Sequence, residues 1–429
     1  MTAARLALTA ERLLAGNGRV LHDAAVVLEH GLVLAVGTRS ELAPLLEGAS
    51  IDAHGDATIL PGLIDAHVHV ALTGDGRSYA EMMDERDEYL ACIAVEHADQ
   101  HLRAGVTTIR DLGARGHTAT AVRQFLGRRA GPSPRLLVSG RPLTMSGGHP
   151  HWCNGTADGV DEGRRTVRVL ASEGVDCIKL VGSGGGTPNT RSYLPSYTVD
   201  ELGAGVEAAH ELGLLTAAHC HATTSVENAV AAGVDCIEHV SFLADRTSSP
   251  VRQEGSSWSG LVAEYDDRVV AQIAASDCYL GMTLLGGYSA VRAARAQGAA
   301  DSEEARLRVA TAEEHVARKL GIFSRLIGDG LLERLVISTD AGAGDTRFGE
   351  LHLALAAAVE GGSSPMQAIE GATRIAARAC GLADETGTLE PGKAGDVLVV
   401  EGDAARDIAA LEQVRAVYRA GRAVPGVGA

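Results

Sequence analysis

The chain has 429 residues, of which 45% are hydrophobic and 22% are charged, and its formal net charge is −17. The length accommodates one large domain of about 250 residues and a smaller one. No segment approaches the run of about 18 apolar residues that a membrane helix needs. The acidic charge, which no basic run offsets, argues against nucleic-acid binding and favours a small-molecule partner.

The N-terminal segment and the cysteines indicate where in the cell the protein is expected. The opening stretch, "MTAARLALTAERLLAGNGR", interrupts its apolar residues with charged ones, so no secretory signal is predicted and a cytoplasmic location is expected. The seven cysteines are odd in number, scattered and free of any Cys-x-x-Cys pair, which argues against both a disulfide framework and a thiolate zinc site. We expect them to be reduced core residues.

Between residues 60 and 387 short β-rich runs alternate with helix-like stretches, which favours parallel βαβ units. Eight such runs occur: "LIDAHVHV", "VTTIRDLG", "PRLLVSG", "DCIKLVGS", "LLTAAHCH", "DCIEHVSF", "CYLGMTL" and "RLVISTD". The helices expected among them are 89–104, 117–129, 162–173, 199–212, 224–232, 266–276 and 350–360. The expected helix 199–212 starts with a capping box from Thr198 to Glu201. Eight strands with intervening helices predict an α/β fold, a TIM-like (β/α)8 barrel.

The two ends of the chain have another pattern. Residues 5–59 and 387–429 contain short strand-like runs separated by turn signals, so the ends are expected to pair into a small composite β-sandwich. The predicted domains are therefore 1–59 (sandwich, first part), 60–387 (barrel) and 388–429 (sandwich, second part). Residues 241–265, rich in Ser, Gly and charge, predict a long loop of the kind that often forms a lid.

Histidines and one aspartate lie near the ends of several predicted strands. His67 and His69 are two residues apart, so a strand places both imidazoles on one face. The other strands contribute His219, His239 and Asp340 at their C-terminal ends, and these ends form the barrel face where catalytic groups gather. Any one of these residues alone would more often be a core or surface group. Together they predict a metal site, because His and carboxylate are the ligands that zinc-like ions take.

Lys179 lies in the middle of a predicted buried strand, "VDCIKLVGSGGG". Burying an unpaired ammonium costs roughly several kcal/mol unless the group pairs, loses its proton or is chemically changed. From this stretch alone, the simpler interpretation is a lysine that extends to water at the strand end.

These motifs in combination resemble the amidohydrolase superfamily, in particular the branch of imidazolonepropionases and Xaa-Pro-type dipeptidases. The resemblance covers nearly the whole chain, through "PGLIDAHVHV", "YTVDELGAGVEAAHELGLLTAAHCHA", "AGVDCIEHV", "STDAG" and "GTLEPGKAGDVLVV". It implies a barrel with a composite β-sandwich and two divalent metal ions, with zinc expected. The implied ligands are His67, His69, Lys179, His219, His239 and Asp340. In similar enzymes the lysine carries carbon dioxide as a carbamate, so Lys179 is expected as an N6-carboxylysine that bridges the two ions.

The resemblance also implies roles at the centre. Asp340 is the expected catalytic acid and base, which takes a proton from water and passes it to the leaving amine. His149, in "TMSGGHPHW", matches a Gly-Gly-His that contacts the substrate carbonyl, so it is expected to bind substrate and to donate a hydrogen bond in catalysis. A surface loop is the alternative for His149. His221 departs from the family pattern and is expected beside the metal rather than on it.

Substrate recognition is predicted from the loop "GGGTPNTRSYLPSYT" that follows Lys179. Its Arg191, Tyr193 and Tyr197 suit a carboxylate, such as the C-terminus of a dipeptide or an N-acyl amino acid. The alternative is that these three side chains pack or solvate the loop.

The predicted function is a metal-dependent amidohydrolase whose metal-bridging hydroxide hydrolyses a C–N bond of a small molecule, such as a dipeptide or an N-acyl amino acid. A homo-oligomer is expected. The alternatives are a cyclic-amide, urea or carbamate hydrolase, and a dehydrative cyclase that uses the same metal site. Lys179 argues against a deaminase, because most deaminases of the superfamily use one metal and lack the bridging lysine. A non-catalytic binding protein on a decayed barrel is the alternative of another class, and the retention of every ligand position argues against it.

Overall fold

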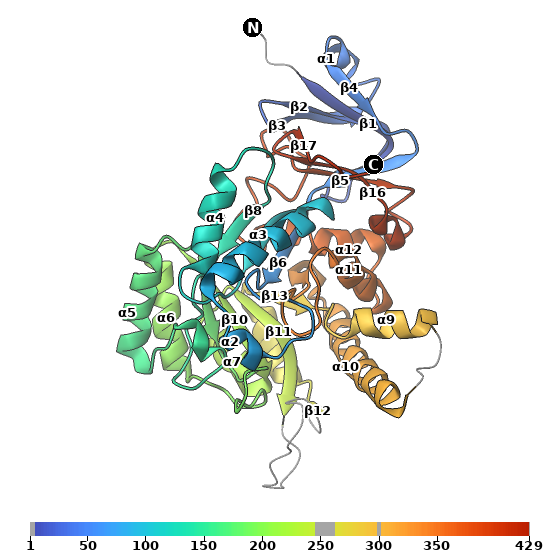
Figure 1. Cartoon of the computed structure of the whole chain (residues 1–429). Helices are drawn as coiled ribbons and strands as arrows, with labels where there is room; N and C mark the ends of the chain where they lie inside the picture. Colours follow the sequence, from blue (N-terminus) through green and yellow to red (C-terminus); the bar gives the residue numbers. More distant parts are fainter. Residues whose placement is uncertain (1–4, 245–261, 298–301, 429) are drawn as a thin grey trace.

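A computed structural model describes residues 5–244, 262–297 and 302–428 (Figure 1). Each of the eight predicted runs forms a strand. They are β6 (Leu63–Val68), β7 (Val106–Asp111), β8 (Arg135–Val138), β9 (Cys177–Val181), β10 (Leu215–Ala222), β11 (Cys236–Ala244), β13 (Tyr279–Thr283) and β14 (Leu335–Ser338). These strands are almost entirely buried, which explains why the sequence shows them as continuous apolar runs.

The eight strands form two parallel sheets. One has the order β14-β13-β11-β10-β9, with the short β12 (Val262–Ala263) beside β11, and the other has the order β6-β7-β8. Backbone hydrogen bonds connect their edges: the Leu143 N–H donates to the Lys179 carbonyl (2.8 Å), and the Asp340 N–H donates to the His67 carbonyl (2.9 Å). The isolated bridges at both junctions are parallel. The C-terminal ends of the strands therefore lie at one rim of a mixed α/β fold.

All seven predicted helices are present. They are α3 (Asp87–Arg103), α4 (Thr118–Arg128), α5 (Gly159–Ser172), α6 (Val199–His210), α7 (Thr223–Ala231), α8 (Asp267–Ala275) and α11 (Leu351–Glu360). The capping box before α6 forms as predicted, because the Thr198 side chain accepts from the Glu201 N–H and the Glu201 side chain accepts in return. Figure 1 shows α5 and α6 on one side of the parallel strands, and α9 (Tyr288–Gln297) and α10 (Glu303–Gly328) on the other.

Six further helices of the described residues were not predicted from the sequence. Four are short: α1 (Ala43–Leu46), α2 (Tyr79–Met83), α12 (Pro365–Gly371) and α13 (Arg374–Ala379). The other two, α9 (Tyr288–Gln297) and α10 (Glu303–Gly328), lie between β13 and β14. The 26 residues of α10 are rich in charge, and among those whose side chains are described only a narrow stripe that includes Val316, Phe323 and Leu326 is buried. A weak apolar period of this kind gives little signal for a helix.

The two ends of the chain pair with each other. The N-terminal part forms β1 (Leu6–Leu14), β2 (Val20–Glu29), β3 (Leu32–Thr38), β4 (Ser50–Ala53) and β5 (Ala57–Pro61), and the C-terminal part forms β15 (Val397–Glu401), β16 (Val414–Arg419) and β17 (Arg422–Ala423). They make one eight-stranded sheet of order β17-β16-β15-β5-β1-β2-β3, with β4 beside β1, at the top of Figure 1. The antiparallel pair β5–β15 joins the two ends. All described strands of this region belong to that one sheet, so a two-layered sandwich stays a prediction.

The predicted loop 241–265 is partly wrong. Residues 241–244 continue β11, and Val262–Ala263 forms β12, which pairs antiparallel with the end of β11. The polar composition hid this extension, because backbone pairing rather than side-chain pattern forms a two-residue strand. Residues 245–261 lie outside the described part of the chain. Within the described part, none of the helices has the length and apolar character to span a membrane. The seven cysteines are free, and five of them are buried.

Candidate metal centre

The six predicted ligands come from five strands and meet at the rim formed by the strand ends. His67 lies on β6 and His69 directly after it, Lys179 on β9, His219 on β10, His239 on β11 and Asp340 after β14. The Asp340 Oδ1 atom is 3.5 Å from His67 Nε2 and 3.4 Å from His69 Nε2. The His219 Nδ1 and His239 Nε2 atoms are 3.0 Å apart. The structure thus brings together residues that are up to 273 positions apart in "IDAHVHV" and "STDAG".

The backbone is strained at two of these positions. His239 has a φ of 71° and Asp340 a φ of 64°, in the left-handed region that non-glycine residues rarely occupy. Such a conformation costs of order 1–3 kcal/mol and is typical of functional sites. Here it occurs within β11 at His239 and directly after β14 at Asp340.

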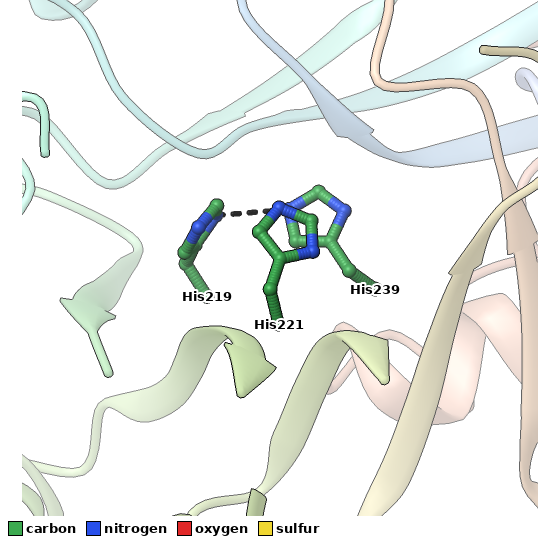
Figure 2. A group of neighbouring side chains, drawn as sticks. All are labelled: His219, His221 and His239. Atoms are coloured by element: carbon green, nitrogen blue, oxygen red, sulfur yellow. Dashed lines mark hydrogen bonds between the residues drawn. The ribbon is translucent and has the colours of Figure 1, made fainter. Parts of the chain in front are cut away.

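Three histidines form one group at the ends of β10 and β11: His219, His221 and His239 (Figure 2). One nitrogen from each lies within 4.8 Å of the others. The rings of His221 and His239 stack with 4.4 Å between centroids. Burial, together with the neighbouring histidines, holds the pKa of all three well below the ordinary range. They are therefore neutral at physiological pH, which is the form that binds a metal.

A second group contains His67, His239 and Asp340, again with ligand atoms within 4.8 Å. Burial and the nearby Lys179 lower the pKa of His67. Burial acts in the same direction on His69, but Asp340 outweighs it and raises the pKa of His69. Burial raises the pKa of Asp340, but His67 and His69 hold it at about 2. Asp340 is therefore a carboxylate at neutral pH and can accept a proton.

Three buried atoms of the predicted ligands have no hydrogen-bond partner among the described residues: His67 Nε2, Lys179 Nζ and Asp340 Oδ1. More than about 90% of buried polar groups in proteins do have one. Lys179 is 2% exposed, so it does not extend to water, and burial lowers the pKa of its ammonium. Neutral nitrogens and a carboxylate oxygen that converge without partners are a donor set that fits a divalent metal ion.

Two residues that support the centre were missed in the sequence. Glu238 accepts a hydrogen bond from His67 Nδ1 (2.8 Å) and another from Arg110 (2.9 Å), and both residues are buried. Burial raises the pKa of Glu238, but His67 and Arg110 outweigh it and hold this pKa far below the usual range. The carboxylate fixes the tautomer of His67, with Nε2 free to bind. The signal was available, since both are charged residues within otherwise apolar strands, as Lys179 is.

His149 is buried and lies beside His219. Its ring centroid is 4.8 Å from that of His219, and its Nδ1 accepts the backbone N–H of Thr187 at 3.3 Å. A backbone N–H can only donate, so the proton of the neutral ring is on Nε2. Burial and the nearby His69 lower the pKa of His149 to about 3, which keeps the ring neutral. Gly185 packs on this ring, where a Cβ atom would come within 2.7 Å of His149 Cδ2.

The predicted substrate residues are placed differently. Tyr197 is 5% exposed, and its hydroxyl donates to the carbonyl of Ala157 at 2.7 Å. Arg191 is exposed and Tyr193 is half-buried on the loop after β9. Among the described interactions, none joins any of the three to a predicted ligand. They are thus not part of the cluster that the ligands form.

An α/β fold with histidines and a carboxylate at the ends of parallel strands is the design of metal-dependent hydrolases. The model of the amidohydrolase family matches residues 58–424. The chain belongs to this family, which confirms the predicted resemblance. It is a hydrolase that acts on a carbon–nitrogen bond of a small molecule, and divalent metals are general in the family.

The chain is also similar to individual proteins of known sequence and structure. The chain is 26% identical to an ochratoxinase from Aspergillus niger, over 97% of this chain and 86% of that protein. It is 25% identical to an imidazolonepropionase from Solibacter usitatus, over 94% of this chain and 91% of that protein. The structure of a Xaa-Pro dipeptidase with bound methionine matches with a TM-score of 0.79 at 24% identity, over 99% of this chain and 100% of that chain. The A. niger ochratoxinase structure also matches with a TM-score of 0.79, at 23% identity over 99% of this chain and 97% of that chain.

Proposed function

We propose that the chain hydrolyses the amide bond of a dipeptide or an N-acyl amino acid with two divalent ions, zinc by the nature of the ligands. The observation that carries this proposal is the convergence of unpartnered His67 Nε2, Lys179 Nζ and Asp340 Oδ1 next to a cluster of neutral histidines. A relative is named a dipeptidase, and its structure holds an amino acid in the active site.

The ligands divide into two groups. His67 and His69 would hold the first ion, and His219 and His239 would hold the second. His221, stacked on His239 and bonded through Nδ1 to Ser241 Oγ (2.9 Å), supports the second group without binding the ion. Asp340 completes the site between the groups.

We further propose that Lys179 is an N6-carboxylysine. Its buried amine, whose lowered pKa favours the neutral form, attacks the carbon of carbon dioxide and releases one proton, which leaves a carbamate anion. The anion supplies two oxygens where the ammonium would have been an unpaired buried cation. Two such oxygens would hold two cations, which would explain why this strand carries a lysine.

The bound ions would supply Lewis acidity to the scissile carbonyl and would acidify the attacking water. The remaining steps belong to the chain. Asp340 accepts the proton of the water as its oxygen bonds to the carbonyl carbon, and delivers that proton to the nitrogen as the C–N bond breaks. His149 donates its Nε2–H to the carbonyl oxygen, where negative charge develops. Glu238 holds His67 in one orientation throughout.

The finer features of the fold belong to the same proposal. The backbone links between β8 and β9 and between β14 and β6 support a closed (β/α)8 barrel over residues 60–387. Residues 1–59 and 388–429 would form the second domain, as a composite sandwich. Arg191 and Tyr193 stay proposed contacts at the rim. A cytoplasmic location and a homo-oligomer stay predictions from the sequence.

The test is a turnover screen of the purified zinc-loaded chain against dipeptides, N-acyl amino acids, cyclic amides and ureas, with metal analysis of the same preparation. We expect two ions per chain and hydrolysis of members of the first two classes. Turnover restricted to ureas or cyclic amides would assign the chain to the alternative substrates. One ion per chain, with activity indifferent to Lys179→Ala, would support a mononuclear enzyme instead.

A further inference from the structure

A small pocket lies against His239, between the end of β13 and helix α10. His239 and Thr283 line one wall, and His315, Lys319 and Ile322 of α10 line the other. The spacing of these three residues, four and then three positions, places them on one face of the helix. The space at the centre is about 10 Å³, which accommodates about one water-sized group. A single carboxylate oxygen has that size.

Lys319 directs a partly satisfied ammonium at this space. Its Nζ donates one hydrogen bond, to the carbonyl of Thr283 at 2.7 Å, and an ammonium has three donors. No second acceptor for it is present among the described residues. Thr283 in turn bonds through Oγ1 to His239 Nδ1 at 2.9 Å. The ammonium is therefore one residue removed from a predicted metal ligand.

The choice of lysine at this position is unusual for this chain. Only three of its 38 lysine and arginine residues are lysines: Lys179, Lys319 and Lys393. Arginine is the cation nearly everywhere else, including the neighbouring Arg318, which bonds to His315 at 3.0 Å. A lysine differs from arginine as a compact point charge. Two of the three lysines thus lie at the metal centre and the pocket beside it.

We propose that Lys319 binds the carboxylate of the substrate, with Arg318 as a second positive charge beside it. The inference rests on the proposed function, and it moves carboxylate recognition from the loop after β9 to helix α10. The placement explains the enclosed ammonium, because an incoming carboxylate satisfies the donors that the fold leaves open. It also needs no contribution from Tyr197, whose hydroxyl already donates to the carbonyl of Ala157.

The test uses a matched pair of probes, Gly-L-Phe and Gly-L-Phe amide, which differ only in the carboxylate. With the zinc-loaded wild-type chain we expect the acid to be preferred in kcat/KM. In Lys319→Met the acid should lose about 10- to 100-fold, mostly through KM, while the amide changes little. Lys319→Arg should recover part of the loss. Arg306→Met is the control, since Arg306 is an exposed cation on the same helix.

Calorimetric titration with the product acid L-phenylalanine and with phenylalaninamide separates this inference from the proposed function. Tighter binding of the acid that depends on Lys319, without hydrolysis of either dipeptide probe, would refute the proposed function and leave the pocket standing. Two results would overturn the proposal that Lys319 binds the carboxylate. They are an equal loss of kcat/KM on both probes in Lys319→Met, and no preference for the acid in the wild type. Melting temperatures identify variants that fail to fold, and Lys319→Gln replaces Lys319→Met in that case.

Discussion

The two halves of the metal centre hold their side chains in different ways. On β10 and β11 the histidines are neutral and bond to each other and to neighbours, such as His239 to Thr283. On β6, β9 and β14 the groups are charged or buried without a partner, as Lys179 and Asp340 are. The neutral half is stable as a hydrogen-bonded cluster, whereas the charged half needs a counterpart for its buried groups. Substitutions in the charged half should therefore have the larger effects.

The largest effect is expected from Lys179→Ala. Without the carbamate the charged half loses the anion that balances two cations, so we expect a loss of at least about 10⁴-fold in kcat. Elemental analysis should find fewer than two ions per chain, and a short carboxylic acid should restore part of the activity. Lys393→Ala is the control, since Lys393 pairs with Glu390 outside the centre. A Lys179→Ala chain with two ions and full turnover would contradict the bridge.

Asp340→Asn tests the proton transfer in the same half. The amide keeps the shape of the side chain but cannot accept the proton of the water, so kcat should fall by about 10²- to 10⁴-fold. Steady-state kinetics on the best substrate of the screen measures this. Asp345→Asn changes an exposed carboxylate on the same loop and should keep normal activity. Comparable losses in the two variants would mean that the loop, and not the Asp340 carboxylate, is responsible.

His219→Ala and His221→Ala divide the roles within the neutral half. His219→Ala should leave about one ion per chain because a direct ligand is lost. His221→Ala removes only a ring stacked on His239, so it should keep two ions with an affinity reduced by about 10- to 100-fold. Metal titration followed by elemental analysis distinguishes the two. If His221→Ala also loses one ion, the three histidines form the second site together.

The smallest effect is expected on the pH dependence of KM, through the ammonium of Lys319, which lies outside both halves of the centre. Burial lowers the pKa of Lys319 from 10.5 to about 8, with Arg318 acting in the same direction and Asp340 and Asp345 opposing it. The ammonium therefore loses its proton as the pH rises through about 8. We expect the KM for Gly-L-Phe to rise a few-fold above that pH, because a charge-assisted hydrogen bond is lost. The KM for Gly-L-Phe amide should stay constant. A parallel rise of KM for both probes would refute deprotonation of Lys319 as the cause.

The same pKa shift has a consequence for folding. Between about pH 8 and 10.5 the unfolded chain holds the Lys319 proton and the folded chain does not, so this group makes the free energy of unfolding rise with pH. Below about pH 8 the folded chain buries the charged ammonium, so the full free-energy cost of burying this charge lowers the stability there. Denaturant titrations across this window should show a smaller rise in Lys319→Met than in the wild type.

Much of the fold was predictable because its elements carry local signals. Buried strands such as β9 and β14 are continuous apolar runs, and the Thr198 capping box marks the start of α6. Helix α10 was missed because charged residues are frequent along it and its apolar stripe is narrow. The ends of the 241–265 segment were missed because β12 exists only through pairing with β11.

The proposed ligands could be found for a related reason, since His67, Lys179 and Asp340 are polar residues within or directly after apolar strands. Glu238 and Arg110 carry the same signal, but their roles depend on which side chain each one meets. No local pattern indicates that Tyr197 bonds to Ala157 or that Lys319 faces His239. Such contacts join segments far apart in the chain.

The sequence by itself determined the strands, most helices and the family, and it indicated the side chains that we propose as metal ligands. These properties follow from the order of residue types, because burial and hydrogen bonding impose a local period on each element. The tertiary structure alone decided which side chains are neutral, which have no partner among the described residues and which cation lies beside His239. Those properties depend on desolvation and on distances between strands and helices, and the order of residues does not contain either.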